Sequence, residues 1–246
     1  SFSRLPGLTG TGRARHPPAM ISDFLHRREL ARIGRDVGDK LDAHPRVQRI
    51  AFDDVKVPMQ IYCYQDFMTP GECAELIRMI DADAIPSELY RAGAGADQND
   101  FRTSYSCNLD RWHPDVLRID DRICGLTGID SRRGETLQGQ RYAVGQQFKA
   151  HHDYFHTDQP YWQKERNKGG QRSWTAMVFL NEPAGGGETE FPQLSFKMLP
   201  RTGMLLIWNN MGLDGRPNPY LLHSGNPVTQ GTKYIVTKWF RRGFWV

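Results

Sequence analysis

The chain has 246 residues, of which 39% are hydrophobic and 24% are charged, and its formal net charge is +4 at pH 7. This composition describes a globular protein with enough apolar material for a sizeable core. The mild charge falls short of the dense basic surface that nucleic-acid binding requires. No apolar run approaches the length of a membrane span, and no secretory signal is recognisable. We therefore expect a cytoplasmic protein with neither a nucleic-acid nor a membrane partner, and four reduced cysteines without the spacing of a zinc site: Cys63, Cys73, Cys107 and Cys124.

The first regular element expected in the chain is a helix that follows an irregular N-terminal stretch. Residues 1–19 are rich in Gly, Pro and Arg without periodicity, and we interpret them as an added leader before a native start at Met20. A helix is predicted from Ser22, as its N-cap, because apolar residues then recur every three or four positions as far as Leu41. Residues 50–64 follow as a strand-rich stretch.

Two further helices carry clearer boundary signals. Thr69 suits an N-cap, Pro70 the first helical position, and Glu72 completes a capping box. A polar, glycine-rich loop is predicted over residues 91–100, and a third helix over residues 114–126. The residues expected to face inward from these two helices are Cys73, Leu76, Ile77 and Ile80, and then Val116, Leu117, Ile119 and Ile123.

From Glu135 onward the hydrophobic period shortens to two, which indicates strands separated by Gly- and Pro-rich turns. Helices followed by many strands predict an α+β fold, with a helical support over about residues 20–134 packed on an antiparallel barrel or sandwich over about 135–246. No internal repeat or second domain is recognisable, so residues 20–246 are expected to form one domain. The predicted strands cover residues 137–144, 147–153, 173–180, 195–199, 204–208 and 234–240.

One short motif in the strand-rich half carries ligand chemistry. His151 and Asp153 are two residues apart, so in an extended strand they point to the same face. With a second histidine from a distant strand, His223, they form a set of two imidazoles and one carboxylate. Such a set leaves coordination positions open and is typical of non-haem Fe(II) oxygenases. We predict these three residues to be the metal ligands, and we do not expect the neighbouring His152 or His156 to bind metal.

A lysine that follows on the last strand suggests an anion beside this metal. Lys233 lies ten residues after His223, at a position expected to point into the barrel. An ammonium group buried without a partner is costly. We therefore expect Lys233 to meet a carboxylate.

Four motifs in this half are similar to those of a known family. The chain resembles the Fe(II)- and 2-oxoglutarate-dependent dioxygenases, and among them the collagen-type prolyl 4-hydroxylase domain found in animals, algae and bacteria. The resemblance covers about residues 60–246. The motifs are Tyr142-x-x-Gly145 to His151-x-Asp153, Gly170-x-Arg172-x-x-Thr175, Gly186-Gly187-x-Thr189-x-Phe191, and His223-x-Gly225-x-Pro227-Val228 to Gly231-x-Lys233 with Trp239.

The resemblance implies a fold, a cofactor set and a reaction. The fold is a double-stranded β-helix, or jelly roll, with supporting N-terminal helices. The metal is Fe(II), the co-substrates are 2-oxoglutarate and O2, and ascorbate is the expected reductant. By the same resemblance, Lys233 binds the far carboxylate of 2-oxoglutarate, and the hydroxyl groups of Tyr142 and Thr189 donate hydrogen bonds to it. Because the carboxylate ligand Asp153 is retained, hydroxylation is favoured over halogenation.

The expected substrate residues include departures from the family pattern. Arg172 and Trp239 match positions that line the peptide-proline site. Phe148 stands where a tyrosine is common, and Arg241 stands where a histidine is expected near the substrate. The segment 157–169 is longer and more charged than expected between the metal motif and Gly170. These differences leave the identity of the substrate open.

Three functions fit these observations. The first is hydroxylation of prolyl residues in a peptide or protein, with oxidative decarboxylation of 2-oxoglutarate to succinate and CO2. The second is hydroxylation of a free amino acid or another small molecule, which the charged segment and an arginine near the mouth would suit. The third is a catalytically silent module that binds proline-rich peptides. The oligomeric state does not follow from the sequence.

Overall fold

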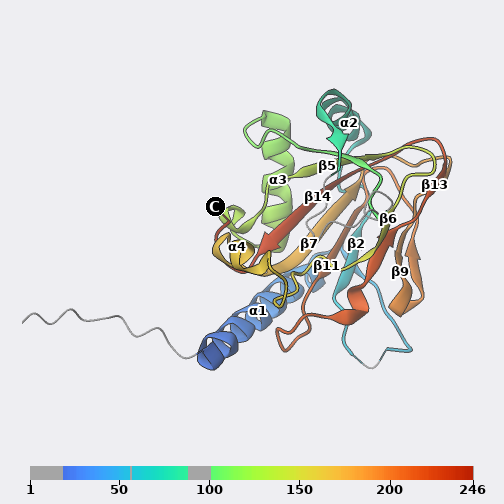
Figure 1. The fold of residues 1–246 in the computed structure, drawn as a ribbon. Coiled ribbons are helices and arrows are strands. Elements are labelled where there is room, and N and C mark those ends of the chain that lie inside the picture. Colours follow the sequence, from blue (N-terminus) through green and yellow to red (C-terminus); the bar gives the residue numbers. More distant parts are fainter. Residues whose placement is uncertain (1–18, 56, 88–100, 246) are drawn as a thin grey trace, which may run out of the picture.

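The computed structural model describes residues 19–55, 57–87 and 101–245, so the leader predicted over residues 1–19, apart from Ala19, and the loop predicted over residues 91–100 lie outside the described residues. Most of the strands belong to two antiparallel sheets (Figure 1). The larger sheet has the order β1 (Gln48–Arg49), β2 (Ile61–Tyr64), β11 (Leu205–Asn209), β7 (Arg172–Phe179), β14 (Lys233–Arg241), β5 (Gln138–Tyr142), β4 (Tyr105–Asn108) and β3 (Ile85–Pro86).

A smaller sheet carries the segments of the predicted metal motif. Its order is β10 (Phe196–Met198), β9 (Thr189–Phe191), β12 (His223–Gly225) and β6 (Phe148–His151), and a separate pair joins β13 (Val228–Gln230) to β8 (Gly185–Gly186). The α+β class with antiparallel sheets is confirmed. Among the strands that the structure describes, the pairings form two larger sheets and one two-stranded sheet and do not close them into one barrel.

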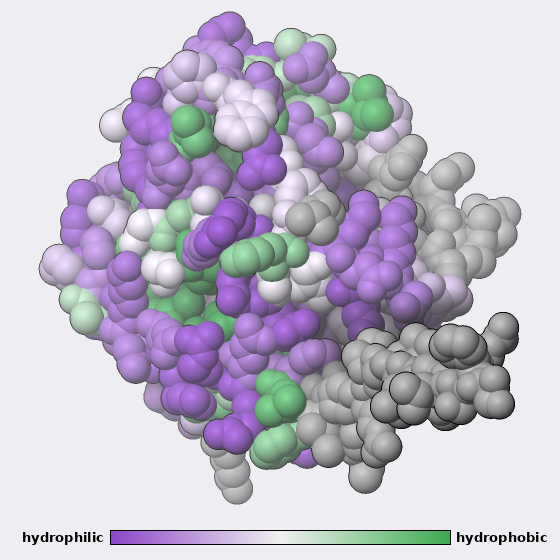
Figure 2. Space-filling model, turned by 90° about the vertical axis from the view of Figure 1, so that its left-hand side faces the viewer, coloured by the Kyte–Doolittle hydropathy of each residue, from purple (hydrophilic) through white to green (hydrophobic). Residues whose placement is uncertain are grey.

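Three helices lie along one face of the larger sheet: α1 (Ala19–Asp42), α2 (Pro70–Asp83) and α3 (Pro114–Thr127) (Figure 1). A fourth helix, α4 (Trp162–Asn167), lies in the charged segment 157–169, which follows Asp153 in the chain. The face of the molecule in Figure 2 is mainly hydrophilic, with apolar side chains in small patches. In the described part of the chain, no helix is both long and apolar enough to cross a membrane.

The hydrophobic core has two layers because strand side chains alternate between faces. Along β7, Trp174, Ala176 and Val178 pack with the helices in one cluster. The intervening Met177 and Phe179 pack in a second cluster on the opposite face. This second layer lies on the side of the smaller sheet and also includes residues of β11 and β14. The central strands are therefore buried on both faces, and the second layer borders the predicted site.

The helix boundaries follow local signals in one case and not in another. The capping box at α2 is confirmed: the Thr69 hydroxyl accepts from the Glu72 amide, and the Glu72 carboxylate accepts from the Thr69 amide. The prediction that Ser22 caps the first helix is wrong, because α1 begins three residues earlier at Ala19. The expectation for Leu117 is also wrong, since it is 41% exposed on α3 and the inward face continues instead to Leu126 and Thr127.

The strand predictions are confirmed for the second half and fail in the first. Strands occur within each of the six predicted stretches from Leu137 onward. The stretch 50–64 is wrong in extent, because only Ile61–Tyr64 pairs as a strand there. Local composition alone could not show which part of this stretch forms a regular strand pairing.

Candidate active site

The three predicted metal ligands converge at the junction of β6 and β12. His151 and His223 are directly paired residues of these antiparallel strands, and Asp153 follows His151 by two positions. The Nε2 atom of His151 lies 3.8 Å from Oδ1 of Asp153, and the Nε2 atom of His223 lies 3.7 Å from Oδ2. One ligand atom from each residue fits within a group whose members are all within 4.8 Å of one another. Such a group has the size of a mononuclear metal site.

Backbone hydrogen bonds select the ring nitrogens that face this point. Nδ1 of His151 lies 2.8 Å from the carbonyl oxygen of Lys149, and Nδ1 of His223 lies 2.9 Å from that of Leu221. A carbonyl can only accept, so both rings carry their proton on Nδ1 and direct the Nε2 lone pair toward Asp153. This arrangement is the one by which proteins orient histidine ligands. The donor set therefore fits a divalent metal such as Fe(II).

The charges at this point are those that metal binding requires. Burial, together with the neighbouring His223, lowers the pKa of His151 to about 3. Burial alone would raise the pKa of Asp153, but the neighbouring His223, His151 and Arg172 and a hydrogen bond from Thr175 hold it below its usual value. A neutral imidazole and an ionised carboxylate are the forms of these side chains that coordinate metals.

A buried relay of hydrogen bonds fixes the carboxylate of Asp153. The Thr175 hydroxyl on β7 donates to Oδ2 of Asp153 at 2.7 Å, and the side-chain amide of Asn210 donates to the Thr175 oxygen at 2.9 Å. All three side chains are buried. Thr175 was part of a predicted motif without an assigned role, and no signal in the sequence pointed to Asn210.

The same three ligands line a pocket that extends along β14 toward Lys233. Lys233 is 2% exposed, and among the described residues no carboxylate lies within ion-pair distance of its Nζ. Its Nζ lies 5.4 Å from the ring centroids of both Tyr142 and Phe179. Burial lowers the pKa of Lys233 to about 7, against a smaller opposing effect of Glu188. A buried lysine in this state can accept an anionic partner, which the described part of the chain does not supply.

The two hydroxyl residues predicted near Lys233 also line this pocket. Tyr142 on β5 is the direct cross-strand partner of Lys233. Its hydroxyl donates to Oε1 of Gln140 at 2.6 Å, and burial raises its pKa. Thr189 on β9 is buried and pairs with Gly225 of β12. The structure thus brings Tyr142, Thr189 and Lys233 to one pocket.

Of the four predicted substrate residues, two line the pocket and two do not. Trp239 and Phe148 are lining residues, and the Phe148 ring stacks on His151 with 3.6 Å between ring centroids. The buried indole N–H of Trp239 has no hydrogen-bond partner among the described residues. Arg172 lies behind Trp239, with its guanidinium carbon 4.1 Å from the ring centroid. Arg241 is 3% exposed and therefore does not stand free at the mouth as expected.

The two neighbouring histidines take no part in the ligand group. His152 lies with Nε2 3.2 Å from the carbonyl oxygen of Pro219, and His156 is exposed. Neither lines the pocket. That they do not bind metal stays a prediction.

Comparison with known proteins identifies relatives for this arrangement. Residues 137–241 match the 2OG-Fe(II) oxygenase superfamily. A probable prolyl 4-hydroxylase 8 of Arabidopsis thaliana is 33% identical over 201 residues, which cover 73% of this chain and 67% of that protein. A putative prolyl 4-hydroxylase of Acanthamoeba polyphaga mimivirus is 30% identical over 73% of each chain.

A solved structure shares both fold and sequence features. The viral collagen prolyl hydroxylase of Paramecium bursaria Chlorella virus-1, solved in complex with 2OG, is 25% identical to this chain. The superposition covers 74% of this chain and 95% of the viral protein, with a TM-score of 0.57.

Proposed function

The chain belongs to the 2OG-Fe(II) oxygenase superfamily and, within it, to the prolyl 4-hydroxylases, and from this membership we propose that it hydroxylates prolyl residues in a peptide or protein, with oxidative decarboxylation of 2-oxoglutarate to succinate and CO2. One observation carries the proposal. A two-histidine, one-carboxylate group lines one pocket with a buried lysine that has no carboxylate partner among the described residues. A metal group alone would fit many reactions, and the lysine supplies the site for an anionic co-substrate.

In this proposal His151, Asp153 and His223 hold Fe(II), which when bound supplies the activation of O2 for hydroxylation. The backbone carbonyls behind both imidazoles hold the rings in place. The Thr175 hydroxyl restrains the carboxylate of Asp153. The protein therefore presents the three donors before the metal arrives, so little conformational entropy is lost on binding.

Lys233, in its protonated form, binds the far carboxylate of 2-oxoglutarate. An ion pair inside this buried pocket is stronger than one in water, because the surroundings screen it less. Tyr142 and Thr189 add hydroxyl hydrogen bonds beside it, for which the Tyr142 hydroxyl turns from Gln140. Ascorbate serves as the reductant that keeps the metal in its active state.

The peptide approaches from the side of Trp239 and Phe148. Both rings line the pocket, and they give an apolar wall that suits a pyrrolidine ring and excludes water. The indole N–H of Trp239, which has no partner in the described part of the chain, can donate to a peptide carbonyl. The small-molecule substrate considered from the sequence loses one of its two supports, because Arg241 is already paired with carboxylates of this chain.

The finer architecture belongs to the same proposal. We propose that the two antiparallel sheets are the two halves of a jelly roll, with residues 20–246 as one catalytic domain that acts in the cytoplasm. The facing of the smaller sheet and the larger one across the second core layer supports the jelly roll.

The test is a single incubation of the protein with Fe(II), 2-oxoglutarate, ascorbate, O2 and a pool of proline-containing peptides. Peptide masses and succinate are measured together. We expect one added oxygen per modified proline with matching succinate, and we expect His223→Ala to abolish both. His156→Ala, which changes an exposed histidine outside the ligand group, is the matched control and should retain activity.

Each other outcome points to a different function. Succinate without peptide oxidation would indicate that the substrate is a small molecule, such as a free amino acid, and not a peptide. Peptide binding without succinate or oxidation would indicate a silent binding module. Full activity of His223→Ala would remove this residue from the metal group.

A further inference from the structure

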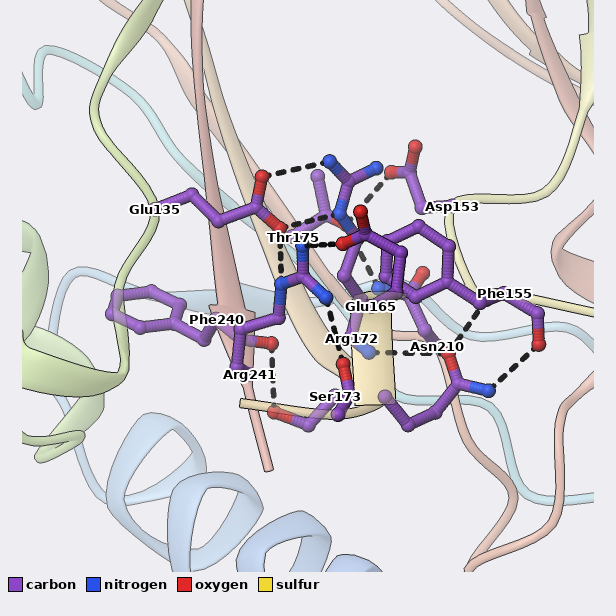
Figure 3. A network of polar contacts seen from close by, with 12 residues as sticks. Glu135, Asp153, Phe155, Glu165, Arg172, Ser173, Thr175, Asn210, Phe240 and Arg241 are labelled. Atoms are coloured by element: carbon purple, nitrogen blue, oxygen red, sulfur yellow. Dashed lines mark hydrogen bonds and ion pairs between the residues drawn. The ribbon is translucent and has the colours of Figure 1, made fainter. Parts of the chain in front are cut away.

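Four charged residues, two of them buried and two half-buried, form a connected network beside the pocket (Figure 3). We call Arg172, Glu135, Arg241 and Glu165 the charge network. Glu135 accepts from Arg172 through both oxygens, at 2.6 and 2.8 Å, and its Oε1 also accepts from Nε of Arg241 at 2.5 Å. Nη2 of Arg241 donates to Glu165 at 2.6 Å. Two guanidinium groups thus face two carboxylates, and the network is balanced in charge.

One member of this network comes from the segment that departs from the family pattern. Glu165 lies on α4, and it is 3% exposed while its neighbours Lys164 and Arg166 are exposed. A carboxylate at this depth is costly unless it is paired. A helix of six residues is too short to be stable alone, so its contacts with the rest of the protein decide its position. Arg241 supplies such a contact by donating to Glu165 and to the carbonyl of Gly170.

The network also reaches the pocket wall. The guanidinium of Arg172, held by Glu135, stacks on Trp239, which lines the pocket. The Phe155 ring lies near both guanidinium groups, with centroid distances of 4.9 Å to Arg172 and 4.5 Å to Arg241. Glu165 is therefore linked to the pocket wall through three successive side chains.

Loss of the Glu165 charge would disturb this order in a defined way. Arg241 would be left with Glu135 as its one carboxylate in the network, and it would compete with Arg172 for Oε1. Arg241 is buried and the Arg172 side chain is only 19% exposed, so their surroundings screen this competition less than water would. Arg172 would then lose part of its two-point contact, and its position over Trp239 would relax.

We propose that Glu165 is a positioning residue that sets the affinity for the peptide substrate by neutralising Arg241 and so holding Arg172 over Trp239. This inference rests on the proposed function, because it assumes that a peptide occupies the Trp239 side of the pocket. It assigns the inserted segment a role in substrate recognition; Arg172 keeps its charge near Asp153, so binding of metal and 2-oxoglutarate should change little. The ligands of the metal and the lysine of the co-substrate site lie outside the network.

The test compares wild type with Glu165→Gln, which keeps the size of the side chain and removes its charge. Peptide binding is measured by calorimetry on protein loaded with Zn(II) and 2-oxoglutarate, and KM values for peptide and 2-oxoglutarate are measured separately with Fe(II). We expect the peptide Kd and KM to rise about tenfold, or ~1.4 kcal/mol, and the 2-oxoglutarate KM and the Zn(II) affinity to stay within about twofold. Arg166→Gln, an exposed change on the same helix, is the matched control and should bind peptide like wild type.

A second variant separates charge balance from simple tethering of α4. Glu165→Gln combined with Arg241→Gln removes one charge of each sign, and we expect it to restore peptide affinity to within about threefold of wild type. If Glu165 only tethers the helix, the double variant will stay as weak as the single one. If Glu165→Gln does not fold, Glu165→Asp retracts the carboxylate by one methylene and should weaken peptide binding about threefold.

The remaining outcomes overturn the inference. Equal peptide affinity of wild type and the folded Glu165 variant would show that the network does not reach the substrate. A parallel loss of 2-oxoglutarate affinity would indicate general disruption of the pocket. Absence of peptide binding by wild type would instead refute the proposed function, and the inference with it, so the two failures are distinguishable.

Discussion

Replacing Thr175 by valine should weaken metal binding without changing any metal ligand. Valine has the shape of threonine but no hydroxyl, so Oδ2 of Asp153 loses its donor at 2.7 Å and the amide of Asn210 loses its acceptor. A buried hydrogen bond to a charged group contributes about 1.5 to 3 kcal/mol. Changes to residues that orient ligands typically cost about 10- to 100-fold in metal affinity. We therefore expect the Kd for Fe(II) to rise about 10- to 100-fold, or ~1.4 to 2.7 kcal/mol.

The measurement is an anaerobic titration of the metal-free protein with Fe(II), repeated with Zn(II) in competition with a chelator. Thr175→Ser retains the hydroxyl and should bind metal nearly as tightly as wild type. Thr127→Val is the second control, because Thr127 is equally buried but donates to the Ile123 carbonyl within α3. A folded Thr175→Val protein with wild-type metal affinity would refute the reasoning. The same loss in Thr127→Val would show that the effect is not specific to Asp153.

Two further predictions concern the co-substrate and the stability of the fold. Because burial lowers the pKa of Lys233 to about 7, binding of 2-oxoglutarate above this pH must take up a proton, so its Kd should rise by up to about tenfold per pH unit. Calorimetry of the Zn(II)-loaded protein in buffers of different ionisation enthalpy would detect this proton uptake. The Lys233→Met variant should lose the pH dependence of 2-oxoglutarate binding. Binding without proton uptake above pH 7 would contradict the role of Lys233. Gly203 has φ +77°, and an added Cβ would lie 2.0 Å from the Met68 carbonyl oxygen. The variant Gly203→Ala should therefore lower the free energy of unfolding by about 2 kcal/mol or more and Tm by about 4 °C or more. Gly71→Ala, whose Cβ would meet nothing within 4 Å, should stay within about 1 kcal/mol of wild type, and equal Tm values for the two variants would argue against the strained turn.

Several features followed from neighbouring residues in the sequence. The α2 boundary was predictable because a capping box joins residues three apart, and it forms as expected. The strands of the second half were predictable because alternation with period two reflects two different faces. The spacing of His151 and Asp153 predicted a shared face for the same reason. Leu117 on α3 is an exception, because the helical pattern predicted that it is buried and the structure shows it exposed.

The sequence by itself determined which residue types meet at the pocket, since four spaced motifs carry the metal group, Lys233 and Trp239. Only the tertiary structure decided how they are held. The Asn210–Thr175–Asp153 relay joins residues from three separate segments. Likewise, Arg241 looked free in the sequence, yet Glu135 and Glu165 take up its charge from 106 and 76 residues away. Periodicity reports which way a side chain points, whereas the partner of a buried charge is set by the packing of distant segments, where an unpaired charge is too costly to remain.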